Sequence, residues 1–282
     1  MNQRKSLKEL NLLDKFLFDE AMDDPENVKI MLDIILSQNT NLKHPPQTEK
    51  EQRTSTDNRQ IRLDVYAIDE DDVIYEVEAQ KENTHNLPKR SRLYQGIIDS
   101  KLLPPGVVDF NLLNEVLIVL IMPFDLFGYG LYRYTFQMRC AEVPELRLND
   151  GATRIFLNTR GKHPELVSPE LIELLKYMEH STDEVSEACE SKRVQDMHRR
   201  VCRIKASEKT EVKYMQTWEE RIMIKQEGIA EGKIEGEKAL LKSLIEKKMV
   251  KKYSAEQIAE MLEIDVSEVE NIMKEIQNEK HL

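Results

Sequence analysis

Two short segments of alternating character constrain the fold of this chain more than any other feature. They read IRLDVYAI at residues 61–68 and VIYEVEAQ at residues 73–80, and the acidic run DEDD lies between them. Alternation of apolar and polar residues with a period of two is typical of β-strands, because successive side chains point to opposite faces of a sheet. The pattern therefore predicts an antiparallel hairpin with an acidic turn.

Two acidic residues are placed symmetrically in this hairpin. Asp71 lies midway between Asp64 and Glu78, so strand pairing should set these two acids opposite each other. In that register one face carries the polar set of Arg62, Asp64, Tyr66, Glu76, Glu78 and Gln80. The other face carries the core set of Leu63, Val65, Ala67, Tyr75, Val77 and Ala79.

The opposed acids have two explanations. Directly opposed side chains have Cβ atoms about 4.5–5.5 Å apart, and like charges at that separation destabilise a sheet unless something compensates them. The acids could be solvated on a half-exposed sheet, or they could hold a divalent cation. Mg²⁺ takes one or two carboxylates together with water and substrate phosphate. The amide of Gln80, on the same face, could orient a water or a phosphate oxygen, and we favour the metal site.

A helix is predicted after the hairpin, over residues 86–103. Pro88 near its first turn and the Pro-Pro-Gly run at residues 104–106 are typical start and stop signals. Its first turn carries three cations, which are Lys89, Arg90 and Arg92. Cations there oppose the helix macrodipole, but they would help a helix N-terminus to bind phosphate. A solvated first turn is the alternative, and Tyr94, on the face of Arg90, could position substrate or simply pack.

The rest of the chain up to residue 167 mixes helical and strand patterns. Residues 11–37 carry apolar side chains at helical spacing around Pro25, which predicts two helices or one kinked helix. Residues 39–59 are polar and contain prolines, as in a loop or an irregular edge strand. Residues 115–124, EVLIVLIMPF, read as a central strand covered on both faces. Two more strand-like runs follow at residues 131–140 and 152–161. This order predicts an α/β domain.

From Ser168 onward the pattern is helical to the end. We divide the chain into a core at residues 1–167, a basic helical region at 168–226, a Glu-Gly repeat at 227–250 and a small helix-turn-helix-like module at 251–282. The basic character is concentrated in residues 192–213, for which a solvated helix face is the simplest explanation.

The Glu-Gly repeat places a glycine at every fourth position, at Gly228, Gly232 and Gly236. Glycine costs a helix about 1 kcal/mol per residue relative to alanine. Spacing by four puts the glycines on one ridge of a helix, where a partner could approach closely. A flexible linker explains the same residues equally well.

The final module has the pattern of two short helices. Ser254 and Ser267 are plausible N-caps. The candidate recognition helix, SEVENIMKEI, is acidic and offers only Lys274 as a cation, whereas contacts to bases and phosphates usually recruit several. We therefore favour a packing or dimerisation module over a DNA reader.

Charge and composition limit the classes of protein further. The net charge of -11 would count against a nucleic-acid binder, because affinity for phosphate comes mainly from Lys and Arg. The charge must therefore be judged segment by segment.

No stretch is apolar enough to span a bilayer, and the first residues lack the apolar run of a secretory signal. Cys140, Cys189 and Cys202 form no CxxC pair, which argues against disulfides and against a zinc site. We expect a cytoplasmic protein with no membrane association and with reduced, structural thiols.

Several segments together resemble the PD-(D/E)XK nuclease superfamily and, within it, the recombination-promoting nuclease (Rpn-like) group, which also carries the label of a transposase family. The segments that carry the resemblance span most of residues 11–220. They are LLDKFLFDEAMDDPE, RLDVYAID, YEVEAQ, NLPKRSRLYQ, FNLLNEV, MPFDLFGYGLYRYTF, RIFLNTRG and KYMQTWEE. The tail with its Glu-Gly repeats is also similar to that group.

The resemblance implies a PD-(D/E)XK restriction-endonuclease-like core, a mixed sheet flanked by helices, with an all-helical C-terminal extension. It implies hydrolysis of DNA phosphodiester bonds with Mg²⁺, for which Mn²⁺ could substitute, and a role in DNA recombination. On this pattern the motif acids are Asp64 and Glu78, and Gln80 occupies the motif lysine position in the E-x-Q form usual in the group. Asp14 matches an acidic position that completes the metal site, although Asp19 could serve instead.

Two functions follow from these patterns. The first is a metal-dependent DNA endonuclease whose catalytic residues are Asp64, Glu78 and Gln80. The second is a non-catalytic DNA-binding or assembly protein that keeps the fold and uses the basic segment and the tail to hold partners. The missing lysine at position 80 favours the second. Both functions predict DNA as a partner and leave room for a homo-oligomer formed through the helical tail.

Overall fold

The structure is a computed structural model that describes residues 4–52 and 61–279. The chain divides into two compact units, Met1–Val212 and Lys213–Leu282. Part of the predicted loop at residues 39–59 therefore lies outside the described residues. The last three residues of the C-terminal module also lie outside them. No helix within the described ranges is both long and apolar enough to cross a membrane.

The first unit is built on a six-stranded mixed sheet with the strand order β1-β2-β3-β4-β6-β5. The strands are β1 (Gln47–Gln52), β2 (Ile61–Ile68), β3 (Ile74–Ala79), β4 (Val116–Met122), β5 (Arg133–Phe136) and β6 (Ala152–Asn158). The strands β3, β4 and β6 run parallel, whereas β1, β2 and β5 pair antiparallel with their neighbours. The predicted α/β class and the predicted antiparallel hairpin of β2 and β3 are confirmed.

The apolar run at residues 115–124 forms β4, which lies inside the sheet between β3 and β6. Side chains on both of its faces are buried, including Ile118 and Leu120 on one face and Val119 and Ile121 on the other. A strand of this kind cannot alternate between apolar and polar residues, because neither face meets water. The predicted central strand is confirmed.

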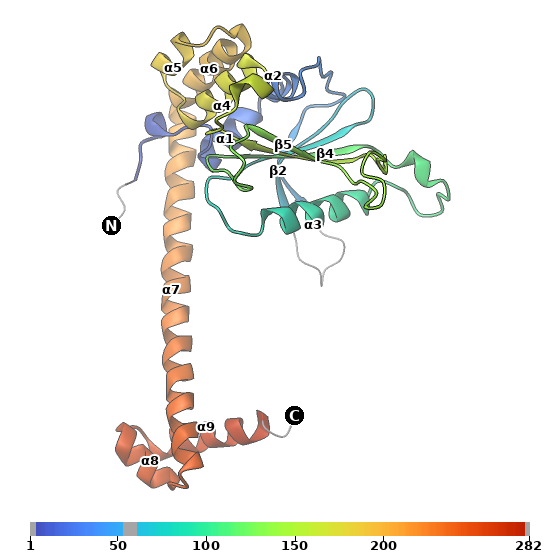
Figure 1. The fold of residues 1–282 in the computed structure, drawn as a ribbon. Helices are drawn as coiled ribbons and strands as arrows, with labels where there is room; N and C mark the ends of the chain where they lie inside the picture. Colours follow the sequence, from blue (N-terminus) through green and yellow to red (C-terminus); the bar gives the residue numbers. More distant parts are fainter. Residues whose placement is uncertain (1–3, 53–60, 280–282) are drawn as a thin grey trace. The chain divides into compact units, whose positions relative to one another are not determined.

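Helices cover both faces of the sheet (Figure 1). The helix α3 (Leu87–Asp99) lies on one face, and α1 (Lys15–Met22) and α2 (Pro25–Leu36) lie on the other. The predicted helical segment at residues 11–37 is therefore two helices. The break is made by Asp24, whose carboxylate accepts a hydrogen bond from the Glu26 amide at 3.1 Å and caps α2, with Pro25 as its first residue. Three short 3-10 helices are η1 (Leu7–Glu9), η2 (Phe110–Leu112) and η3 (Pro164–Leu166).

Three further helices extend the layer formed by α1 and α2. They are α4 (Pro169–Glu179), α5 (Asp183–Glu187) and α6 (Lys192–Lys205). Contacts of α4 and α6 with α2, and of α6 with α1, keep these helices in the first unit. The predicted boundary after residue 167 does not coincide with this division, because the apolar faces of α4 and α6 are buried within the unit through residues such as Leu174, Tyr177, Val194 and Met197.

The second unit contains most of the long helix α7 (Glu208–Val250), followed by α8 (Ala255–Leu262) and α9 (Val266–Glu279). The Glu-Gly repeat is helical and lies inside α7. A small core forms from Ile245, Ile258, Ala259, Val269 and Ile276. Ser254 caps α8 as predicted, since its side chain accepts from the Gln257 amide, whereas Ser267 lies inside the first turn of α9 and is not its cap.

Candidate active site

The hairpin of β2 and β3 brings the two predicted acids together. Tyr66 pairs with Glu76 and Val65 pairs with Val77, and Asp64 and Glu78 are the next residues along the two strands. Asp64 is close enough to raise the pKa of Glu78. Gln80 follows the last residue of β3, and its backbone N–H donates to the carbonyl of Ile121 at 2.8 Å. The predicted register is confirmed from Val65–Val77 to Ile68–Ile74, whereas direct pairing of Asp64 with Glu78 stays a prediction. Leu63, predicted on the opposite face from Tyr66, packs in the same cluster as Tyr66 and Ile74, so the strict alternation of faces in β2 does not extend through Asp64.

The polar face of the hairpin is not exposed to water. Asp64 is 6% exposed, Glu76 0% and Glu78 8%. The face is covered because the register of β3 with β4 aligns Glu76 and Glu78 with apolar residues, Ile118 and Leu120, that pack beneath α3. The alternative of acids solvated on a half-exposed sheet is therefore wrong.

Two cations approach the buried acids. The Nζ atom of Lys15, at the start of α1, lies 2.6 Å from Oδ1 of Asp64 and 3.0 Å from Oδ1 of Asp19. Arg90, in the first turns of α3, forms an ion pair with Glu78 and donates to Oε1 of Gln80 at 2.6 Å. Lys15 had no predicted role, although its spacing of four residues from Asp19 is typical of a helical ion pair.

Three carboxyl groups beside these cations have raised pKa values. Burial raises the pKa of Glu78 to about 7, against the opposing effect of the Arg90 guanidinium. Burial likewise raises the pKa of Glu76 well above its ordinary value, and the neighbouring Glu78 and Asp64 add to this effect. Burial also raises the pKa of Asp19 to about 7, although Lys15 opposes the change.

The pKa of Lys15 itself reports the strength of the acid cluster. Burial alone would lower the pKa of this ammonium group, but the nearby carboxylates of Asp64 and Asp19 outweigh burial and raise it. A buried cation shifts in this direction only when anions surround it. The ion pairs with Asp64 and Asp19 therefore stabilise the charged form of Lys15.

The positive charges of the nearby described side chains do not neutralise the carboxyl groups of this cluster. It contains four carboxyl groups (Asp19, Asp64, Glu76 and Glu78) and two cations (Lys15 and Arg90), an excess of two negative charges when all are ionised. Both oxygens of Glu76 and Oε2 of Glu78 are buried and have no hydrogen-bond partner among the described residues. Buried charges without partners are costly, so the cluster requires bound protons or an additional cation.

Asp14, the third predicted metal ligand, has different partners. Its carboxylate accepts from the amide of Asn11 at 2.9 Å and forms an ion pair with Lys81. Asp19, by contrast, shares Lys15 with Asp64. Hydrogen bonds thus connect Asp19, and not Asp14, to the acid pair.

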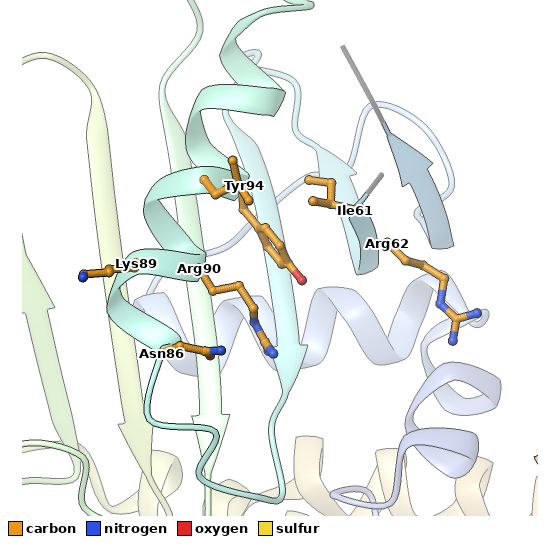
Figure 2. Close-up of a pocket in the computed structure, with 7 residues that line it drawn as sticks. Ile61, Arg62, Asn86, Lys89, Arg90 and Tyr94 are labelled. Atoms are coloured by element: carbon orange, nitrogen blue, oxygen red, sulfur yellow. The ribbon is translucent and has the colours of Figure 1, made fainter. Parts of the chain in front are cut away.

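A pocket of about 350 Å³ borders the cluster, between α3 and β2. Three cations line it, which are Arg62, Lys89 and Arg90. Figure 2 shows the side chains of Arg90 and Tyr94 extending side by side from α3, whereas Lys89 extends away from them. Burial raises the pKa of the Tyr94 hydroxyl, and Glu78 contributes to this shift, so Tyr94 lies within the field of the acids. Arg92 is exposed on α3 and is not among the residues lining this pocket.

Three basic residues of the segment at residues 192–213 have partners elsewhere in the first unit. Arg193 pairs with Glu170 of α4, and Arg200 lies 2.7 Å from Asp24 at the start of α2. Lys205 donates to the carbonyl of Ser181 at 2.8 Å. These contacts hold α6 against its neighbours, which gives several of the basic residues a structural role.

Comparisons with protein-family models, with curated proteins and with solved structures find no match to this chain. The geometry and chemistry of the acid cluster therefore carry the functional conclusion.

Proposed function

We propose that the chain is a metal-dependent DNA endonuclease that hydrolyses phosphodiester bonds at the Asp64–Glu78 pair. The observation that carries this proposal is the buried excess of carboxylates beside a cation-lined pocket. A bound cation would neutralise the buried carboxylates, and the adjacent Lys89 and Arg62 could bind the phosphates of a nucleic acid backbone. The combination favours a metal ion and a nucleic acid meeting at one end of the sheet.

The residues present fit Mg²⁺. Its preferred ligands are oxygens, of which proteins often supply only one or two as carboxylates, and Oε2 of Glu78 lacks a partner among the described residues. Asp64 and Glu78 would hold the ion. Asp14 or Asp19 would have to move closer to add a third ligand, because neither forms with the pair a group of ligand atoms within 4.8 Å of one another. When bound, a divalent ion of this kind polarises a phosphoryl oxygen and lowers the pKa of a water.

The chain's own residues divide the remaining work. Lys15 and Arg90 offset part of the negative charge and orient Asp64 and Glu78 through their ion pairs. The carbonyl oxygen of the Gln80 side chain is held by Arg90, and its amide nitrogen donates to the carbonyl of Glu82 at 2.6 Å. The second N–H of the Gln80 side chain would orient a water or a phosphate oxygen, but an amide cannot accept a proton as a general base.

A second candidate is a non-catalytic DNA-binding or assembly protein. Two observations favour it: Gln80 replaces the lysine of the motif, and Lys15 and Arg90 already pair with Asp64 and Glu78. If the two cations were the permanent partners of the acids, the fold would persist without a metal ion and without cleavage. DNA retention would then be indifferent to EDTA.

Cleavage of supercoiled plasmid separates the two functions. We expect the purified protein to nick or linearise plasmid with Mg²⁺ or Mn²⁺ and to leave it intact with EDTA. Ca²⁺ should support binding without cleavage. The variants Asp64→Asn and Glu78→Gln should abolish cleavage while leaving DNA retention in place.

The matched control is Asp72→Asn, which removes an exposed acid from the turn of the same hairpin. Its cleavage should equal that of the wild type. Plasmid that stays intact with every metal ion, alongside DNA retention that survives EDTA, would establish the second function.

A further inference from the structure

Three potential metal ligands of different chemistry converge in the helical layer of the first unit, away from the acid cluster. Asp183 is the first residue of α5, and His198 and Cys202 lie four residues apart on α6. The Nε2 atom of His198 lies 2.9 Å from Oδ1 of Asp183 and 3.3 Å from Sγ of Cys202, and Sγ lies 3.9 Å from Oδ1. Within residues 4–52 and 61–279, no other group of three His, Cys, Asp or Glu side chains brings its ligand atoms this close.

The arrangement does not suit a nucleophilic cysteine. In a Cys-His-Asp relay the carboxylate bonds one ring nitrogen of the histidine while the thiol faces the other. Here the carboxylate lies 2.9 Å from Nε2, and the thiol sulfur lies beside the ring, 3.3 Å from Nε2 and 3.8 Å from Nδ1. The pKa of the Cys202 thiol is raised, first by burial and then by Asp183, whereas a reactive thiol needs a lowered pKa.

The opposite ring nitrogen has a partner of its own. The hydroxyl of the buried Tyr177, on α4, lies 3.0 Å from Nδ1 of His198. A metal-binding histidine usually uses its second nitrogen in this way, because that hydrogen bond fixes the tautomer and the orientation of the ring. Tyr177 thus holds the ring with Nε2 toward the carboxylate of Asp183.

The spacing of the three atoms suits a borderline cation. Zn²⁺ bonds to N, O and S ligands at about 2.0–2.3 Å, which sets the corners of a tetrahedron roughly 3.3–3.8 Å apart. The observed separations of 2.9, 3.3 and 3.9 Å scatter around that range. The side chain of His198 is 12% exposed and that of Asp183 is 80% exposed, so an ion could enter from the solvent side without opening the core.

We propose that Asp183, His198 and Cys202 form a site for a zinc-class divalent cation, with a fourth position open to water. Binding releases the thiol proton to solvent and requires the neutral imidazole to carry its proton on Nδ1, from which it is donated to the hydroxyl of Tyr177. The ion links α5 to α6 and thereby stabilises the helical layer. The absence of a CxxC pair argued only against zinc sites built on two neighbouring cysteines. This site instead combines one Cys with a His one helical turn away and an Asp from another helix.

Cobalt substitution in the full chain tests the site. The protein is stripped with EDTA and titrated with Co²⁺, whose bond to a thiolate gives a charge-transfer absorption in the near ultraviolet. We expect one Co²⁺ per chain with this absorption, which Zn²⁺ should displace. Cys202→Ser and His198→Gln should lose the absorption, while the matched variants Cys140→Ser and Cys189→Ser should keep it.

A second measurement on the wild type is independent of how the variants fold. Zn²⁺ should slow alkylation of Cys202 at least tenfold and leave alkylation of Cys140 unchanged. Asp64→Asn should retain the cobalt signal, so this site and the proposed nuclease site fail or survive separately. The proposal is overturned if the wild type shows no thiolate-to-cobalt absorption, if Cys202→Ser keeps it, or if Zn²⁺ leaves the alkylation of Cys202 unaffected.

Discussion

At the scale of single residues, the environment of Asp64 determines how the site can be tested. Its carboxylate accepts from Lys15 at 2.6 Å and contributes to the raised pKa of Glu78. Neutralising Asp64 relieves repulsion between like charges but also removes the partner of Lys15. These effects oppose each other in the metal-free protein, so the response to added metal is the informative quantity.

We expect Mg²⁺ to stabilise the wild type but neither Asp64→Asn nor Glu78→Gln. Only the native state holds the ion, and a ligand at a hundred times its dissociation constant adds about 2.7 kcal/mol to the free energy of unfolding. Denaturant unfolding with and without Mg²⁺ measures the difference. An equal gain in the wild type and in both variants would show that the ion binds elsewhere.

The identity of the third acidic ligand is a separate question at this scale. We expect Asp19→Asn to weaken Mg²⁺ binding at least tenfold, a loss of about 1.4 kcal/mol, and Asp14→Asn to weaken it little. The reason is that Asp19 shares Lys15 with Asp64, whereas Asp14 pairs with Lys81. Calorimetric titration with Mg²⁺ measures the affinity of both variants. A larger loss of affinity in Asp14→Asn than in Asp19→Asn would identify Asp14 as the third ligand.

At the scale of elements, α3 carries two kinds of cation on neighbouring residues. Arg90 turns toward the acids and pairs with Glu78, while Lys89 and Arg92 are exposed. The triple of cations predicted to bind phosphate therefore separates into one residue that stabilises the acid cluster and two that are free of it. Substitutions should treat the two groups differently.

We expect Lys89→Ala and Arg92→Ala each to flatten the salt dependence of DNA binding. Each lost phosphate contact removes about 0.9 from the slope of log K against log salt on duplex DNA. Binding measured by fluorescence anisotropy over a salt series gives the slope. Lys233→Ala, which removes a lysine paired with Glu237 on α7, serves as the control. A slope that changes no more than in this control would exclude the first turns of α3 as the phosphate site.

At the scale of the whole molecule, the two units should be separable. Removing residues 228–282 leaves the first unit complete, since that unit ends at Val212. The glycines of the repeat have open space around them, with nothing within 4 Å of an added Cβ atom, so a second chain could approach that ridge. Ile229, Ile234 and Leu240 on the same helix are exposed as well.

We expect this truncation to preserve the unfolding transition of the first unit and to lower the mass in solution by more than the deleted residues account for. Self-association through α7 is the reason. Replacing Gly228, Gly232 and Gly236 with alanine should also weaken association, because added methyl groups hold the ridges apart. Light scattering measures the masses of the full-length chain, the truncated chain and the triple alanine variant. A monomeric full-length chain would contradict self-association through α7.

The sequence by itself determined the hairpin of β2 and β3, most of its register and the central strand β4. Alternation in residues 61–68 and 73–80 and the symmetric placing of Asp64 and Glu78 about Asp71 defined the hairpin, because strand pairing is a local consequence of side-chain period. The sequence also predicted β4 from its apolar run and the start of α8 from Ser254, because both signals are local. Each of these signals lies within a few residues of the structure it specifies.

Only the tertiary structure decided the chemical state of the site. The burial of Glu76 comes from α3 closing over the sheet, and the pairing of Lys15 with Asp64 joins residues 49 positions apart. Likewise Asp183, His198 and Cys202 meet because α5 packs against α6. Desolvation and charge pairing depend on which distant side chains exclude water from a group, and no local pattern in the chain records that exclusion.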